Sequence, residues 1–349
     1  MIIAGAASAL PKYEYDQRVL LEALSEYWGP RMEEPRFIER LHQRMKVDTR
    51  YLAMPMEDYY GLERWGQAND KWIEVAVDLA EEALTRALER SGLRAEQIGL
   101  IYFVSVTGIS SPSVEARLVN RMRLPVNVKR VPIFGLGCVG GAACVARAAD
   151  YVKAYPDQVA AVISVELCSL TLQRDDLSVA NLISSGLFGD GCGVVLVAGA
   201  DTGARGPRIL ATRSVFYPDT EHVMGWEVSE KGFKIVLSRE VPEMVEKNLA
   251  GDTDAFLRDQ GLTRADIGNW ILHTGGPRVL EATQAALQLP ECALEVSWEC
   301  LRRTGNLSSA SVLLVLEETM EHRRPAPGTY SLMAAMGPAF CSELLLLRW

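Results

Sequence analysis

A cysteine in a glycine-rich turn is the residue of this sequence best suited to nucleophilic chemistry. The stretch IFGLGCVGGAACVARAADYV, residues 133–152, sets Cys138 between an apolar run and an alanine-rich run, with glycines at 135, 137, 140 and 141. This pattern predicts a strand, a tight turn and a helix, with Cys138 just before the first helical turn. Unpaired N–H groups and the helix dipole stabilise a thiolate there, and the glycines let the backbone bend and leave space above the sulfur. A buried structural cysteine is the alternative interpretation.

A thiol nucleophile needs a base, and one of the four histidines stands in a suitable place. His273 ends the apolar run NWIL and precedes TGGP, so it is expected at a strand end, where ligands collect in α/β proteins. Asn306 lies in a glycine turn ahead of a helix of small residues, where a neutral amide can point into a cavity. Both could hold the oxyanion of a thioester enolate, while His273 and Cys138 form a thiolate–imidazolium pair that accepts an acyl group. Taken singly, a structural histidine and a helix-capping asparagine are the alternatives.

The elements that must position these residues alternate between strands and helices. Apolar runs predict strands in the opening residues and at 98–106, 159–167, 192–199, 269–273, 329–336 and 341–349, and residues 73–92 have apolar positions at helical spacing. This alternation predicts an α/β fold with largely buried sheets. The segments SGLRAEQIGLIYF and QGLTRADIGNWIL are alike enough to indicate a duplication, with halves at 1–200 and 210–349. The site is therefore expected where the two halves meet.

Composition limits the classes of function. The chain has 349 residues, of which 48% are hydrophobic and 23% charged, a normal balance for a folded protein with a substantial core. Its net charge of -9 argues against nonspecific nucleic-acid binding, and no apolar run is long enough for a membrane span. Seven cysteines without a Cys-x-x-Cys pair or zinc-like spacing predict reduced thiols, a cytoplasmic location and no metal site. The cysteines other than Cys138 are expected to be structural.

Several motifs occur in the order found in one enzyme family. GCVGGAA, SSGLFGDGCG, GFKIVLSREVPEMVEKNL, HTGGPRVLEA, TGNLSSASVLLVLEE and AAMGPAFCSELLL together make the chain resemble the type III polyketide synthases, the chalcone and stilbene synthase family of the thiolase superfamily. The resemblance implies a thiolase-like, five-layered αβαβα fold, a homodimer, and a catalytic triad of Cys138, His273 and Asn306. It also implies that Phe188 is a gatekeeper between a coenzyme A tunnel and the reaction cavity.

The reaction that the resemblance implies is a decarboxylative condensation. Cys138 takes a starter acyl group from an acyl-CoA, malonyl-CoA loses carbon dioxide to give an enolate held by His273 and Asn306, and the enolate attacks the thioester. Neutral donors suit this chemistry because a carboxylate at position 306 would repel the enolate. No cofactor is expected beyond the CoA thioesters, which are substrates.

A basic helix is expected to bind the phosphates of coenzyme A. Arg36, Arg40 and Arg44 recur every four residues and are therefore expected on one face of a helix. By the resemblance, Arg40 and Arg44 match the family's nucleotide-binding helix, whereas its third basic position is Phe37 in this chain.

The product is suggested by residues that the resemblance assigns to the cavity wall. A second gatekeeper phenylalanine of the family is replaced by Ile235, which reshapes an apolar cavity, and the cyclisation loop reads AAMGPA. With the segment DTEHVMGWEVSEKGFKI, these features make the chain more similar to bacterial enzymes that extend fatty acyl starters into alkylpyrones or alkylresorcinols. The other cavity residues carried over are Thr171, Ser308, Met336, Pro338 and Ser111, the last standing where plant enzymes place a methionine that reaches across the dimer.

Three other functions compete with this interpretation. A ketoacyl-ACP synthase III would perform a single condensation, but its histidine typically precedes QAN, whereas His273 precedes TGGP. A thiol-dependent acyl-CoA hydrolase would release a free acid without forming a carbon–carbon bond. An acyl-binding scaffold would bind acyl-CoA and turn nothing over, which the intact triad disfavours.

Overall fold

A computed structural model describes residues 1–349 and is built around one nine-stranded sheet, in the order β11-β12-β13-β8-β1-β7-β6-β4-β5. Five of these strands come from the first part of the chain: β1 (Ile2–Ala9), β4 (Ile98–Val104), β5 (Lys129–Ile133), β6 (Val159–Leu167) and β7 (Asp190–Ala198). Four come from the last part: β8 (Arg208–Phe216), β11 (Ile267–Leu272), β12 (Tyr330–Gly337) and β13 (Cys341–Arg348). The two sets meet at one paired position, Ile2 of β1 opposite Arg208 of β8.

The strand pattern confirms the duplication. The two sets of strands meet at β1 and β8. Counted outward from there, β1-β7-β6-β4 has two antiparallel pairs and then a parallel pair, and β8-β13-β12-β11 repeats this pattern. The strand β5 then adds in parallel to β4 at the free edge. The two similar segments, SGLRAEQIGLIYF and QGLTRADIGNWIL, also have similar backbones. In each, the glycine between a long helix and the next strand has a left-handed φ, 68° at Gly92 and 71° at Gly261. The division into 1–200 and 210–349 stays a prediction.

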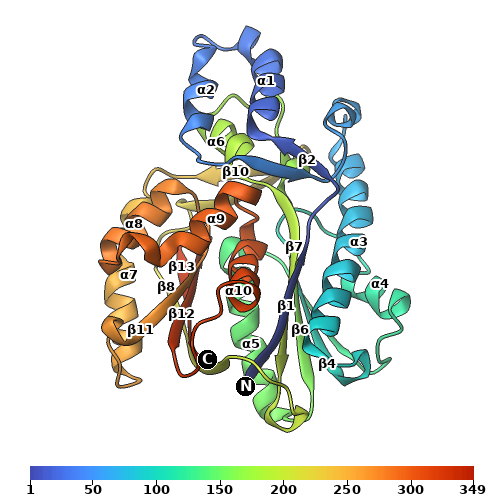
Figure 1. Cartoon of the computed structure of the whole chain (residues 1–349). Helices are drawn as coiled ribbons and strands as arrows, with labels where there is room; N and C mark the ends of the chain where they lie inside the picture. The colour runs from blue at the N-terminus through green and yellow to red at the C-terminus, as the bar shows by residue number, and fades with distance from the viewer.

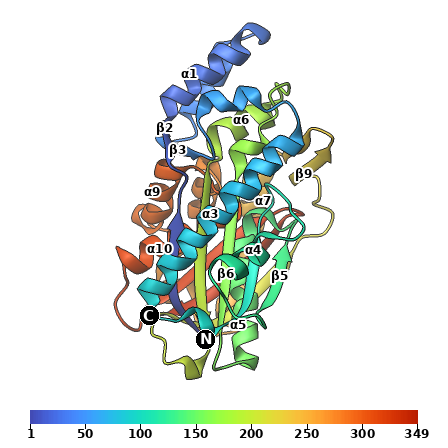
Figure 2. The ribbon, with the colours of Figure 1, turned by 90° about the vertical axis from the view of Figure 1, so that its right-hand side faces the viewer.

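Helices complete the five layers expected from the sequence (Figure 1). The helices α5 (Gly140–Ala154) and α10 (Ser311–Glu321) lie between the two halves of the sheet and contact strands of both. The outer face of the first half is covered by α3 (Trp65–Ser91), with α4 (Val114–Arg121) beside it (Figure 2). On the opposite side of the molecule, α7 (Val241–Arg258) and α8 (Pro277–Leu287) cover the second half.

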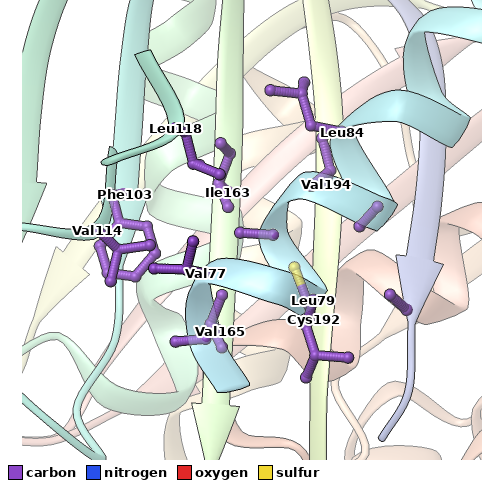
Figure 3. Close-up of a cluster of buried hydrophobic side chains, with 14 of the residues drawn as sticks. Val77, Leu79, Leu84, Phe103, Val114, Leu118, Ile163, Val165, Cys192 and Val194 are labelled. Atoms are coloured by element: carbon purple, nitrogen blue, oxygen red, sulfur yellow. The ribbon is translucent and has the colours of Figure 1, made fainter. Parts of the chain in front are cut away.

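The layers explain why some strands read as unbroken apolar runs. Along β6, Ile163 and Val165 face the cluster under α3, whereas Ala160 and Val162 face the central helices. Figure 3 shows the outer cluster, in which Val77 of α3 lies against Ile163 and Val165. A strand buried on both faces needs apolar residues at every position, and all nine residues of β6 are buried.

The end of the molecule away from the two chain termini carries the remaining elements (Figure 1). They are the ribbon of β2 (Tyr13–Asp16) and β3 (Thr49–Leu52), the helices α1 (Gln17–Trp28), α2 (Arg36–Gln43), α6 (Val179–Leu187) and α9 (Glu295–Thr304), and the hairpin of β9 (Met224–Ser229) and β10 (Gly232–Leu237). None of the helices combines the length and the apolar character needed to cross a bilayer.

Candidate active site

Cys138 lies where the sequence predicted it, in a turn that leads from β5 into α5. The turn is a short 3-10 helix, Gly137–Val139, and Cys138 is 9% exposed. The glycines bring this turn close to the second half of the chain. A Cβ atom at Gly141 would lie 2.2 Å from the carbonyl oxygen of Ser309, so only glycine lets α5 approach the segment after Asn306 this closely.

His273 and Asn306 reach the same place from the second half. His273 directly follows the last residue of β11, and its N–H donates to the carbonyl of Ala334 at 3.0 Å. The Asn306 oxygen Oδ1 accepts from the N–H of Ser308 at 2.8 Å and from the hydroxyl of Ser311 at 3.2 Å. These bonds fix the turn that leads from Asn306 into the short 3-10 helix before α10, and neither helix takes Asn306 as its N-cap residue. Because its oxygen is occupied, its amide NH₂ is the group left to donate elsewhere.

One cavity of about 480 Å³ brings the three side chains together. Cys138, His273 and Asn306 all line it, and most of its other lining residues are hydrophobic. Six further residues named from the sequence also line it: Phe188, Ile235, Ser308, Met336, Pro338 and Arg44. Four named residues lie outside the lining: Thr171, Ser111, Arg36 and Arg40.

Burial controls the electrostatics of the site. It raises the pKa of the Cys138 thiol to about 12, against hydrogen bonds to the Ser308 and Asn306 side chains, which lower it. It also lowers the pKa of His273 to about 4. Burial therefore favours a neutral thiol and a neutral imidazole in the free protein. The thiol contacts the Ser308 hydroxyl, with Sγ 3.6 Å from Oγ.

The two ring nitrogens of His273 are available to a substrate, because no group of the protein binds them. Neither Nδ1 nor Nε2 has a hydrogen-bond partner in the protein, although both atoms are buried. An unsatisfied buried polar group costs about 1–3 kcal/mol, so a purely structural histidine would be paired. This observation favours the functional interpretation of His273 over the structural one.

The burial of His273 should make the free energy of unfolding depend on pH. Its pKa is about 4 in the folded protein and 6.5 as the reference value, so between these values only the unfolded chain takes up the proton. The stability from the neutral ring is fully present above pH 6.5 and is lost as the pH falls to 4. At roughly 1.4 kcal/mol per pKa unit, the loss at pH 5 is roughly 2 kcal/mol. Denaturant titrations should show that His273→Asn loses roughly 2 kcal/mol less than the wild type between pH 7 and pH 5, and an unchanged pH dependence would contradict this.

The three arginines expected on one helix differ in their relation to the cavity. Arg36 and Arg40 lie within α2, which ends at Gln43, and Arg44 is its C-cap residue, with a helical φ of -81° and ψ of -11°. The Arg40 guanidinium donates to Glu34 at 2.7 Å and lies over the ring of Phe37. Arg44 lines the cavity together with Arg239 and Arg278, and all three arginines are exposed. They therefore mark its opening.

Sequence reasoning missed Arg239, Arg278 and Cys168. The two arginines follow the hairpin and the loop after His273, and only the fold brings them to the same cavity as Arg44. Cys168 lines the main cavity and also a second, mainly apolar cavity of about 100 Å³, and its structural role stays a prediction. Phe188 lines both cavities as well. Thr171 lines neither cavity, and its hydroxyl donates to the Cys168 carbonyl at 2.7 Å.

Comparisons with known proteins show the family to which this chain belongs. The chain matches the family models for the N-terminal domain of chalcone and stilbene synthases over residues 35–202 and for their C-terminal domain over residues 208–349. It is 49% identical over 350 residues to the 1,3,6,8-tetrahydroxynaphthalene synthase of Streptomyces peucetius subsp. caesius, and this alignment covers 99% of this chain and 93% of that protein. It is 29% identical over 346 residues to the phloroglucinol synthase of Pseudomonas fluorescens, and this alignment covers 97% of this chain and 96% of that protein.

A solved structure has the same fold. The crystal structure of the 1,3,6,8-tetrahydroxynaphthalene synthase of Streptomyces coelicolor, described as a bacterial type III polyketide synthase, superposes with a TM-score of 0.95 at 30% identity and covers 100% of this chain and 99% of that one. With both family models and the whole fold matched, this chain belongs to the chalcone and stilbene synthase family, the type III polyketide synthases, which transfer acyl groups from CoA thioesters by decarboxylative condensation.

Proposed function

We propose that this protein uses malonyl-CoA to build an aromatic polyketide of the tetrahydroxynaphthalene type. The observation that carries the proposal is the convergence of Cys138, His273 and Asn306 on one apolar cavity. The product is suggested by the relative at 49% identity, which is named for 1,3,6,8-tetrahydroxynaphthalene. Alternating oxygenation in that molecule is the pattern left by joining two-carbon units.

The triad can perform each step without a metal or a further cofactor. Neutral His273 accepts the thiol proton as the Cys138 sulfur attacks a thioester carbonyl, and the leaving CoA sulfur takes this proton, so His273 is neutral again. Malonyl-CoA then loses carbon dioxide, and the electron pair of the broken bond becomes an enolate whose oxygen accepts hydrogen bonds from His273 and Asn306. The enolate carbon attacks the acyl group on Cys138, a carbon–carbon bond forms, and the sulfur leaves as a thiolate. The apolar wall, including Phe188, excludes water from these intermediates.

A fatty acyl starter, as the sequence suggested, is the second candidate. The observation that favours it is the second, mainly apolar cavity of about 100 Å³, which shares Phe188 and Cys168 with the main one. Apolar walls of this kind suit an alkyl chain, and Ile235 in place of an aromatic side chain leaves the main cavity aliphatic at that point. The products would then be alkylpyrones or alkylresorcinols.

One assay distinguishes these products. Purified protein is incubated with malonyl-CoA alone and with malonyl-CoA plus octanoyl-CoA, and products are identified by mass. We expect tetrahydroxynaphthalene from malonyl-CoA alone. Alkylpyrones only in the second mixture would support the fatty acyl starter instead. A single-extension ketoacyl product or free octanoic acid would point to the ketoacyl synthase or the hydrolase, which the family membership does not favour.

The opening of the cavity provides the charge that coenzyme A requires. We propose that Arg44, Arg239 and Arg278 contact its diphosphate, since all three are exposed and line the cavity. Arg36 and Arg40 lie on the exposed side of α2 and are proposed to contact the distal phosphate.

Removing a charge at the opening should weaken substrate binding alone. Each of Arg44→Ala, Arg239→Ala and Arg278→Ala should raise the KM for malonyl-CoA about fivefold, the equivalent of about 1 kcal/mol for an exposed charge pair. The KM for malonyl N-acetylcysteamine thioester, which lacks phosphates, should not change. The control is Arg94→Ala, which removes an exposed arginine that does not line the cavity. Equal effects on both thioesters would refute phosphate recognition.

The free edge of the sheet supports the proposed homodimer. The strand β5 is exposed along four of its five residues, and Val131 and Phe134 are 36% and 52% exposed. The exposed residues of β5 are Lys129, Arg130, Val131 and Pro132, so this edge offers a partner both charged and apolar side chains. We propose that a second copy covers it, which would also give Ser111 a place near the partner's cavity. A monomer mass in sedimentation equilibrium would contradict the dimer.

A further inference from the structure

Arg50, in β3, is a buried cation that is bound to neutral oxygens. It is 4% exposed, and burial lowers its pKa only to about 10, so it is charged at neutral pH. Its Nε donates to Oε1 of Gln17 at 2.8 Å, and its Nη1 donates to the carbonyl of Phe188 at 3.0 Å. The buried carboxylate of Asp190 interacts with it electrostatically but is itself held by two backbone N–H groups. An arginine kept only for stability would be poorly placed here, because burying a cation is costly.

The bonds of Arg50 belong to a brace around the end of α6. Three successive carbonyls at this end are each held by a different partner: Gly186 by Gln17 Nε2 at 2.8 Å, Leu187 by the Asn306 N–H at 2.8 Å, and Phe188 by Arg50. The N–H of Gly189 returns to the Asn306 carbonyl at 3.1 Å, so that Phe188 and Asn306 form an isolated parallel bridge. The segment with the gatekeeper and the segment with the catalytic amide are thereby joined through their backbones.

The strand of Arg50 is also fixed to the other side of this bridge. The N–H of Asp48 donates to the Arg302 carbonyl at 2.7 Å, and the Thr49 hydroxyl donates to the Arg303 carbonyl at 2.6 Å. These carbonyls lie in the last turn of α9, directly before Asn306. A Cβ atom at Gly305 would lie 2.6 Å from the Leu187 carbonyl oxygen and 3.4 Å from Arg50 Cδ, which shows how closely the three segments pack.

We propose that Arg50 is a positioning residue for the decarboxylation step. Arg50 binds the Phe188 carbonyl, and its strand binds carbonyls at the end of α9. Together these bonds fix the position of the Asn306 amide relative to the cavity. This inference rests on the proposed role of Asn306 as a donor to the enolate. A shift of about 1 Å in such a donor is enough to cost on the order of 100-fold in rate. The backbone of Cys138 belongs to the turn before α5, and only side-chain contacts of its thiol with Ser308 and Asn306 link it to this brace.

The test is a split between kinetic constants. Arg50→Met should lower kcat for malonyl-CoA consumption on the order of 100-fold, while KM and the rate of Cys138 alkylation by iodoacetamide stay within about threefold of wild type. Arg50→Lys keeps the charge but loses the fork that reaches two oxygens, so it should recover to within about tenfold. If Arg50→Met does not fold, the lysine variant carries the test alone, with a fall in kcat and unchanged alkylation as the expected result.

Arg264 provides a matched control. It donates to the carbonyls of Ala286 and Leu287 at the end of α8, as Arg50 donates to a carbonyl at the end of α6, and it also pairs with Asp254. Arg264 lines neither cavity, whereas Arg50 lines the second one. Arg264→Met should therefore lower the melting temperature without lowering kcat. The proposal is overturned if alkylation falls as much as kcat, or if Arg50→Met and Arg50→Lys lower kcat no more than Arg264→Met. A wild-type protein that does not consume malonyl-CoA would instead contradict the proposed function.

Discussion

A Cys138→Ser variant is expected to make no detectable polyketide, with a fall in kcat of at least about 1000-fold. Burial already raises the pKa of the thiol to about 12, so it would disfavour ionisation of a less acidic hydroxyl even more. Neutral His273 can take a proton from a thiol that attacks a thioester, but a serine alkoxide in this cavity is far harder to form. The measurement is product mass after incubation with malonyl-CoA.

Two other cysteine variants make this result specific. Cys144→Ser changes a fully buried thiol of α5 that does not line the cavity, and its kcat should stay within about threefold of wild type. Cys138→Gln imitates the acylated enzyme, so it should still convert malonyl-CoA to acetyl-CoA while elongation is lost. If Cys138→Ser elongates within tenfold of wild type, Cys138 is not the nucleophile.

The buried centre of the fold could be predicted from the sequence because each of its strands is covered on both faces. The run 159–167 is apolar at nearly every position and was predicted with the bounds of β6. In β8, by contrast, buried and exposed residues are mixed, so no clear strand pattern marks that segment. The helix α3 begins at Trp65, eight residues before the predicted start at 73, because its first two turns are mostly polar or partly exposed.

The triad could be predicted because each member follows a recognisable local pattern, but its surroundings could not. Arg239 and Arg278 line the same cavity as Arg44 only because three separate segments pack around it. Cys168 follows a buried strand, and the sequence does not tell whether that strand end opens onto a cavity. The brace at Arg50 is similar, because its bonds to Phe188 and Gln17 cross 138 and 33 residues of sequence. Local patterns locate reactive groups, whereas long-range contacts decide what holds them.

Asn306→Asp tests the enolate site with almost no change in shape. In the wild type, Oδ1 accepts from the Ser308 N–H and the Ser311 hydroxyl, and a carboxylate oxygen can keep both bonds. Only the donating NH₂ is lost, and a negative charge replaces it where the enolate forms. Loss of one oxyanion donor costs about 3–4 kcal/mol, and the charge adds repulsion, so malonyl-CoA decarboxylation at pH 7 should fall at least about 1000-fold.

The pH dependence of this variant separates charge from structure. Burial raises the pKa of a carboxyl group, and the carboxyl group introduced by Asn306→Asp would be neutral once protonated and could donate again. Decarboxylation by Asn306→Asp should therefore recover as the pH falls from 7 to 5.5, while that of the wild type does not rise. Asn306→Ala loses both bonds of Oδ1 as well as the donor, so it should show no such recovery and a lower melting temperature. An Asn306→Asp enzyme that keeps a tenth of the wild-type rate at pH 7 would show that the amide does not hold the enolate.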